Sequence, residues 1–125
     1  MKQSKPSKDV QKLRIITYLD DMGDIRCFRV EGHAGYAERG EDIVCAAVSA
    51  LTIAAVNGLE KYLAKMPLAK AADGILECTL PALDSEQDRL IARSILGTML
   101  LGLTQIRDNY GTRYISFEQG RWTPC

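Results

Sequence analysis

The sequence contains a single histidine, His33, and its four cysteines form no Cys-x-x-Cys pair. One histidine with scattered cysteines does not supply the ligand spacing of a zinc site, so we expect no bound metal. The chain also lacks a glycine-rich phosphate loop of the GxxxxGKS or GxxxxGKT kind and a GxGxxG motif. We therefore expect no cofactor.

The chain also has no excess of charge of one sign, because 16 basic residues balance 16 acidic ones. A formal net charge of zero argues against nucleic-acid binding through bulk charge. We find no stretch that reads as long and apolar enough to span a bilayer, and the basic N-terminal segment lacks the apolar core of a secretory signal. We therefore expect a cytoplasmic protein with no membrane partner, whose cysteines are free thiols.

The length of 125 residues, with 46% hydrophobic and 26% charged residues, is that of one globular domain. Residues 1–12 are polar and rich in lysine. We interpret them as a disordered basic lead, with contact to RNA as the alternative. Residues 13–125 then form the single domain.

Alternation of apolar residues and turn signals predicts four strands, at 13–19, 25–30, 75–80 and 112–118. Two helices are predicted, from 43 to about 65 and from 84 to 108. This β-β-α-β-α-β order indicates an α+β fold in two layers, with a mostly antiparallel or mixed sheet and both helices packed on it. The first half of the first helix is apolar or small on every side, so we expect it to be buried, partly against another chain.

The chemistry-bearing residues gather where the second strand leads into the first helix. Asp42 is a favourable helix N-cap, which makes Cys45 the third helical residue. The backbone N–H groups of a first turn, that of Cys45 included, favour a thiolate and can stabilise an oxyanion. His33 lies on the glycine-rich loop before this helix, so it can reach Cys45 as base and then as acid. The alternative is that Cys45 is a small buried hydrophobe and His33 a structural loop residue.

The neighbouring residues each have two interpretations. Asp42 caps the helix, and it can also orient His33 or shape the pocket. Ser49, one turn after Cys45, either hydrogen-bonds into the site or fills a tight helix contact. The loop glycines give a peptide room to bind or permit positive φ angles. Cys27 and Cys78 lie in predicted strands and are expected to be buried, and Cys125 has no assigned role.

The stretch GHAGYAERGEDIVCAAVSAL, residues 32–51, resembles the signature of the ribosomal-processing cysteine proteases, the Prp family. The positions that match are Gly32, His33, Ala34, Gly40, Asp42, Ile43, Val44, Cys45, Ala46 and Ser49. The likeness in length and element order extends from about Leu13 to Trp122.

This resemblance implies a cysteine endopeptidase in which Cys45 is the nucleophile and His33 the base, with Asp42 and Ser49 supporting the pocket. It implies a substrate as well: the family removes a short N-terminal extension from large-subunit ribosomal protein twenty-seven of bacteria and cuts after an aromatic pair. Tyr36 is a candidate for the aromatic-accepting pocket from its place in the loop. The family also forms homodimers.

A second class of function is a non-enzymatic, ribosome-associated binding protein, which the small size and the basic lead favour. Thiol reactivity distinguishes the two, because a catalytic Cys45 reacts with iodoacetamide near neutral pH much faster than Cys27 or Cys78. A thiol redox protein is a third possibility, but it needs a resolving cysteine near Cys45, and the sequence places none there.

Overall fold

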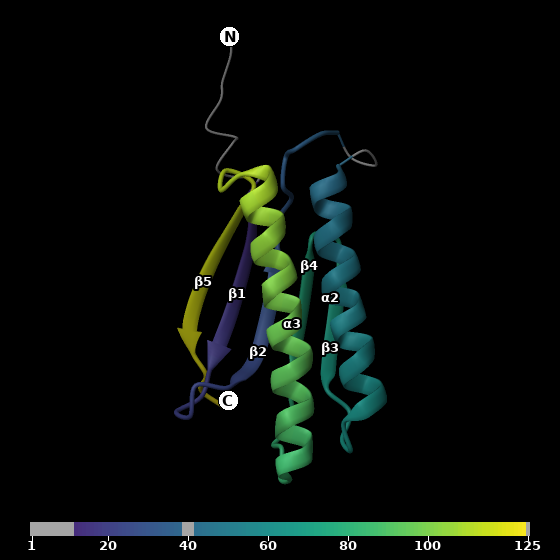
Figure 1. The fold of residues 1–125 in the computed structure, drawn as a ribbon, viewed down its shortest axis with the longest axis vertical. Coiled ribbons are helices and arrows are strands. Elements are labelled where there is room, and N and C mark those ends of the chain that lie inside the picture. The colour runs from purple at the N-terminus through teal and green to yellow at the C-terminus, as the bar shows by residue number, and fades with distance from the viewer. Residues whose placement is uncertain (1–11, 39–41, 125) are drawn as a thin grey trace.

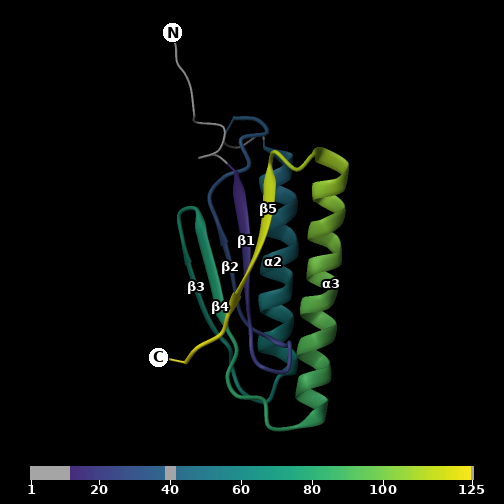
Figure 2. The same ribbon diagram turned by 90° about the vertical axis from the view of Figure 1, so that its left-hand side faces the viewer.

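Five strands form one mixed sheet, and two long helices cover one of its faces (Figures 1 and 2). The elements of this computed structural model are, in chain order, β1 Leu13–Leu19, β2 Ile25–Glu31, α2 Ile43–Tyr62, β3 Leu68–Ala72, β4 Ile75–Thr79, α3 Glu86–Tyr110 and β5 Ile115–Arg121. The structure describes residues 12–38 and 42–124. The predicted disordered lead, apart from its last residue, and Gly40 therefore lie outside the described residues.

The strand order is β3-β4-β2-β1-β5, and every neighbouring pair is antiparallel except β1 and β5, which run parallel. The predicted α+β class, with a mixed sheet and both helices on it, is confirmed. The predicted element order misses one strand, because β3 precedes β4 and pairs with it from Leu68↔Thr79 to Ala72↔Ile75. Its sequence, LAKAA, is rich in alanine and has little strand propensity, so only the pairing with β4 makes it a strand.

Most predicted boundaries lie within three residues of the observed ones, and the departures have local causes. Helix α3 begins after Ser85, whose hydroxyl accepts the Asp88 N–H at 3.0 Å, rather than at residue 84. It ends at Tyr110, and Gly111, which has φ of 116°, suits the position after a helix. A turn then occupies residues 112–114, so β5 begins at Ile115 opposite Leu13 instead of at residue 112.

The core lies between the sheet and the helices. Phe28, Ile15, Leu59, Leu103 and Ile115 are among the largest fully buried side chains. Full burial of such a side chain contributes roughly 1.5–3 kcal/mol. Cys27 and Cys78 are buried and the described cysteines are free thiols, which confirms two predictions. The other face of the sheet carries exposed ion pairs, such as those of Arg14 with Glu31 and Glu118, and these contribute ~0–1 kcal/mol each.

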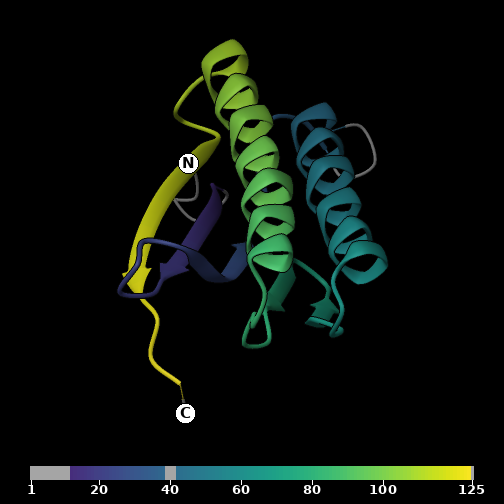
Figure 3. The same ribbon diagram turned by 60° about the horizontal axis from the view of Figure 1, so that its bottom comes forward.

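The two helices lie side by side over the sheet (Figure 3). They approach closely at Gly102, where an added Cβ would lie 2.7 Å from a Leu51 methyl carbon. Only one face of α2 is buried in the single chain, and Ile43 and Ile53 on the other face remain half exposed. Within the single chain, the first half of this helix is therefore buried on one face only, and its expected burial against another chain stays a prediction.

The expectation that no segment is long and apolar enough to cross a membrane is wrong. Helix α2 passes that test by length and composition. The hydropathy of α2 was underestimated from the sequence because its apolar run contains many alanines and other small residues. One such helix is weak evidence for a membrane segment, since core helices of other proteins pass the same test. In this fold its inner face packs on the sheet.

Candidate active site

His33 and Cys45 line one cavity of about 240 Å³ at the end of the sheet where β2 leads into α2. Cys45 and Ser49 enter it from α2, one helical turn apart, and His33 enters it from the loop after β2. A third wall comes from the hairpin of β3 and β4, through Ala71, Ala72, Gly74 and Ile75. The fold thus brings together the two residues that the sequence singled out, and it adds a hairpin that the sequence did not indicate.

Cys45 is held by two hydrogen bonds, one through its backbone N–H and one through its sulfur. Its backbone N–H donates to Asp42 Oδ1 at 3.0 Å, which confirms Asp42 as the N-cap of α2. Its sulfur accepts the backbone N–H of Ala34 at 3.2 Å, so the loop after His33 docks on the thiol. The Cys45 N–H is therefore already engaged and is not free for an oxyanion. The Ala34 N–H is the donor that lies beside the reactive atom.

The electrostatics of Cys45 differ from the expectation for a helix start. Burial raises the pKa of the Cys45 thiol, the Ala34 N–H lowers it, and the Asp42 carboxylate raises it again, with a net increase. The N-cap that fixes the helix thus places a negative charge close to the sulfur. Burial and the Asp42 carboxylate therefore act against the thiolate that the start of the helix favours, and a base beside Cys45 would offset them.

His33 is positioned by two glycines. Gly32 has φ of 91°, and a Cβ there would lie 2.6 Å from the backbone oxygen of Lys12, so no larger residue fits before the histidine. The Gly32 N–H donates to the Gly74 oxygen at 2.9 Å, which ties the loop to the β3–β4 turn. A Cβ on Gly74 would lie 3.3 Å from His33 Nε2. Gly74 is a site residue that could not be predicted from the sequence, because its contact with His33 depends on the pairing of β3 with β4.

Asp42 does more than cap the helix. Its Oδ2 accepts the backbone N–H groups of Tyr36 at 3.0 Å and Ala37 at 3.5 Å, so one carboxylate joins the loop to the helix start. Burial acts against the charge of Asp42, but the N–H groups of Cys45, Tyr36 and Ala37 outweigh it and lower the pKa of the carboxyl. Both interpretations of Asp42, cap and pocket-shaping residue, are compatible with this geometry.

Tyr36 does not lie among the residues that line the cavity. Its ring packs edge-on against Tyr110 at 5.5 Å and Tyr114 at 5.2 Å, at the end of α3. Ser49 lines the cavity and is exposed. No group of three or more potential metal ligands is found among the described residues.

We expect the charge of Asp42 to make stability depend on pH. Because the pKa of Asp42 is lowered in the folded chain, its carboxylate stabilises the fold above its ordinary pKa of about 4, and this contribution is lost as the pH falls through the lowered value. Asp42→Ala is expected to cost roughly 0.5–2 kcal/mol at pH 7 from the lost cap. Urea unfolding of Asp42→Asn and the wild type at pH 7 and at pH 3 isolates the charge. A difference in unfolding free energy that is the same at both pH values would contradict this role.

A half-buried thiol in the first turn of a helix, with a histidine in the same cavity, is an arrangement suited to a cysteine hydrolase. The family described as cysteine protease Prp matches residues 13–116, and the chain belongs to this family. The chain is thus a cysteine-type endopeptidase.

Relatives in two bacteria share most of the chain. The ribosomal processing cysteine protease Prp of Staphylococcus aureus is 32% identical over 92 residues, which are 74% of this chain and 85% of that protein. The protein of the same name from Bacillus subtilis is 31% identical over 88 residues, 69% of this chain and 79% of that protein.

Solved structures agree with the fold. A crystal structure of the essential ribosomal processing protease Prp from S. aureus, in complex with a covalently linked product peptide, superposes with a TM-score of 0.76 at 27% identity, covering 86% of this chain and 98% of that one. The crystal structure of SMU.848 from Streptococcus mutans has a TM-score of 0.73 at 24% identity, covering 90% of this chain and 97% of that one, and supports the fold alone.

Proposed function

We propose that this endopeptidase removes the N-terminal extension of large-subunit ribosomal protein twenty-seven, with Cys45 as nucleophile and His33 as base. The observation that carries the proposal is that His33 and Cys45 line one cavity in a chain of the Prp family. The names of the relatives, which are ribosomal processing proteases, support the substrate class. The S. aureus structure with a covalently linked product peptide supports a mechanism through a covalent intermediate.

The first step follows from the raised pKa of the Cys45 thiol. His33 accepts the Cys45 proton as the thiolate attacks the scissile carbonyl, since the raised pKa of Cys45 does not favour a standing ion pair. The carbonyl oxygen becomes an oxyanion, and the Ala34 N–H, which donates to the sulfur at 3.2 Å in the resting protein, turns to it. His33 then protonates the leaving amine, and water releases the acyl group from Cys45.

Cleavage of the extended ribosomal protein is the direct test. Purified chain is incubated with that substrate, and the product masses are read. Wild type is expected to release the extension and Cys45→Ala to leave the substrate intact. Cys27→Ala is the matched control, because Cys27 is also a free thiol but lies outside the cavity, and this variant should cleave. If folded wild type leaves the substrate intact, the substrate assignment is wrong. If Cys45→Ala cleaves the substrate, Cys45 is not the nucleophile.

Thiol labelling separates this proposal from a binding protein without activity. Burial raises the pKa of Cys78 to about 12 and raises that of Cys27, whereas Cys45 is partly accessible. Iodoacetamide should therefore label Cys45 first among these three. Because the pKa of Cys45 is raised as well, we expect its labelling at neutral pH to be slower than that of an ordinary exposed cysteine, while the selectivity over Cys27 and Cys78 remains.

We also propose that the chain acts in the cytoplasm as a homodimer. Support for the dimer is the outer face of α2, where Ile43 and Ile53 are half exposed beside a row of alanines. Ala54→Glu places a charge on this face away from the cavity, and it should shift sedimentation toward the monomer. Ser94→Glu on the exposed side of α3 is the control. A monomeric wild type at all concentrations would contradict the dimer.

A further inference from the structure

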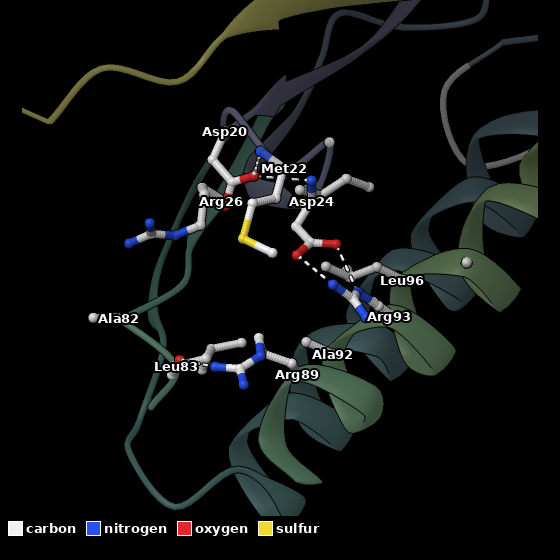
Figure 4. A pocket seen from close by; sticks show the side chains of 13 residues that line it. Asp20, Met22, Asp24, Arg26, Ala82, Leu83, Arg89, Ala92, Arg93 and Leu96 are labelled. Atoms are coloured by element: carbon white, nitrogen blue, oxygen red, sulfur yellow. Dashed lines mark hydrogen bonds and ion pairs between the residues drawn. The ribbon is translucent and has the colours of Figure 1, made fainter. Parts of the chain in front are cut away.

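A second and larger cavity lies at the opposite end of the sheet from His33 and Cys45. Its volume is about 350 Å³, and it is enclosed by the β1–β2 turn, the segment before α3 and the first half of α3 (Figure 4). The seven residues of β1 separate the two cavities by roughly 20 Å. A volume of this size is within the range of pockets that hold small ligands, about 300–1,000 Å³.

The floor of this cavity is apolar. Ala92 and Leu96 of α3 are buried in the core beneath it, and Leu83 is partly buried against the same core. Met22, whose side chain is largely exposed, extends from the β1–β2 turn toward the cavity (Figure 4). An apolar group placed there would leave water on contact with these side chains, which contributes roughly 25 cal/mol per Å².

The wall carries three arginines, and one of them is paired with a carboxylate of the lining. Arg93 binds both oxygens of Asp24, at 2.7 and 2.9 Å, and this pairing lowers the pKa of Asp24. The other carboxylate of the lining, Asp20, uses Oδ1 to accept the backbone N–H groups of Met22 and Asp24. The acidic residues of the cavity are therefore engaged with the turn and with Arg93.

The other two arginines keep free donors. Arg89 donates one bond to the Leu83 oxygen at 3.0 Å, and its nearest carboxylate, on the exposed Glu86, is 3.9 Å away. Arg26 lies 5.2 Å over the ring of Trp122, and its Nε is buried with no hydrogen-bond partner among the described residues. A buried donor without a partner is unfavourable, because it has lost its hydrogen bonds to water. In Figure 4 the guanidinium groups of Arg26 and Arg89 both lie on the side of the cavity toward Ala82.

We propose that this cavity binds a carboxylate carried on an apolar body. The carboxylate lies between Arg26 and Arg89, whose planar donors match its two oxygens, and the apolar body rests on Leu96 and Ala92. Two sources have this chemistry: a fatty acid, and a peptide with an apolar C-terminal residue and a free C-terminal carboxylate. The second is the kind of product that an endopeptidase releases. The site does not depend on the assignment of Cys45 or His33.

Trp122 is the only tryptophan of the chain and reports on Arg26 directly. The full chain is titrated with octanoate and with N-acetyl-Leu-Phe, and binding is read by tryptophan fluorescence and by equilibrium dialysis. Octanol, acetate and the amide of the same dipeptide are the comparisons. At least one of the two acids should bind saturably. The acid that binds shows whether the ligand is a fatty acid or a peptide with a free C-terminal carboxylate. The neutral analogues and acetate should bind at least tenfold more weakly.

Variants place the binding in this cavity. Arg26→Gln and Arg89→Gln should each raise the dissociation constant of the acid at least tenfold, while Arg113→Gln, an exposed arginine outside the cavity, should not change it. Thermal unfolding checks that Arg26→Gln still folds. If Arg26→Gln does not fold, Arg89→Gln, on the helix surface, still tests the proposal. Cys45→Ala should bind the acid as wild type does, which separates this site from the catalytic one. Equal binding of acid and neutral analogue, no binding of either acid, or loss of binding in Cys45→Ala alone would overturn the proposal.

Discussion

His33→Ala is expected to lower kcat/KM for cleavage at neutral pH by roughly two to four orders of magnitude, with little change in stability. The size of the effect follows from the state of Cys45. Burial and Asp42 raise the pKa of its thiol, so without a base the enzyme holds less thiolate than an ordinary cysteine would at that pH. His33 is exposed and outside the core, so its removal leaves the packing intact.

The pH dependence of the variant makes the test specific for proton transfer. In wild type His33 supplies the base, whereas in His33→Ala cleavage depends on the ionisation of Cys45 itself and should rise with pH up to the raised pKa of that thiol. Imidazole added to the buffer should restore part of the rate of His33→Ala and none of the rate of Cys45→Ala. A neutral-pH kcat/KM within threefold of wild type would exclude His33 as the base.

Gly32→Ala is expected to reduce both the free energy of unfolding and activity. A side chain at φ of 91° costs about 1–3 kcal/mol from the backbone conformation alone. The new Cβ would also lie 2.6 Å from the Lys12 backbone oxygen, which is not the end of a flexible side chain and has to shift together with the start of β1. Because Gly32 precedes His33 and bonds to Gly74, this shift displaces the histidine as well.

Gly23→Ala is the matched control for this substitution. Gly23 has a similar φ of 83° in the β1–β2 turn, but a Cβ there would meet no atom within 4 Å. Urea unfolding of both variants separates the two costs, since Gly23→Ala has only the conformational one. Equal losses in unfolding free energy for the two variants would show that the contact with Lys12 is unimportant, and full cleavage activity in Gly32→Ala would contradict its role beside His33.

Most of the fold could be predicted because local signals agree with the tertiary structure. Strand β1 and the start of α2 lie where the alternating pattern and the Asp42 cap placed them. Strand β3 could not be predicted, because alanine and lysine favour helix and its strand form depends on β4. The start of β5 was displaced for a related reason: its register is set by parallel pairing with β1, some hundred residues away in the chain.

The candidate site was predicted through residues close together in the sequence. His33, Asp42 and Cys45 lie on one loop and one helix start, so their proximity follows from local structure. Gly74 and the alanines of β3 were missed, because they reach the cavity only through the sheet. The catalytic assignments of His33 and Cys45, and the roles of Gly32, Ser49 and Tyr36, stay predictions. The effect of the Asp42 charge on the pKa of Cys45 could not be predicted from the sequence. Asp42 caps the helix, but its carboxylate also lies close to the Cys45 sulfur.

The parallel pairing of β1 with β5 has a consequence for when the enzyme becomes competent during its own synthesis. Of the described strands, β1 is synthesised first, and its parallel neighbour β5 is synthesised last. Leu13, at the start of β1, lines the cavity of Cys45, and its N–H bonds to the Tyr114 oxygen. That part of the cavity is therefore fixed only after Tyr114 and β5 have been translated. We therefore expect a nascent chain that ends before β5 to lack the finished site, so that the protease becomes active only after β5 has been made.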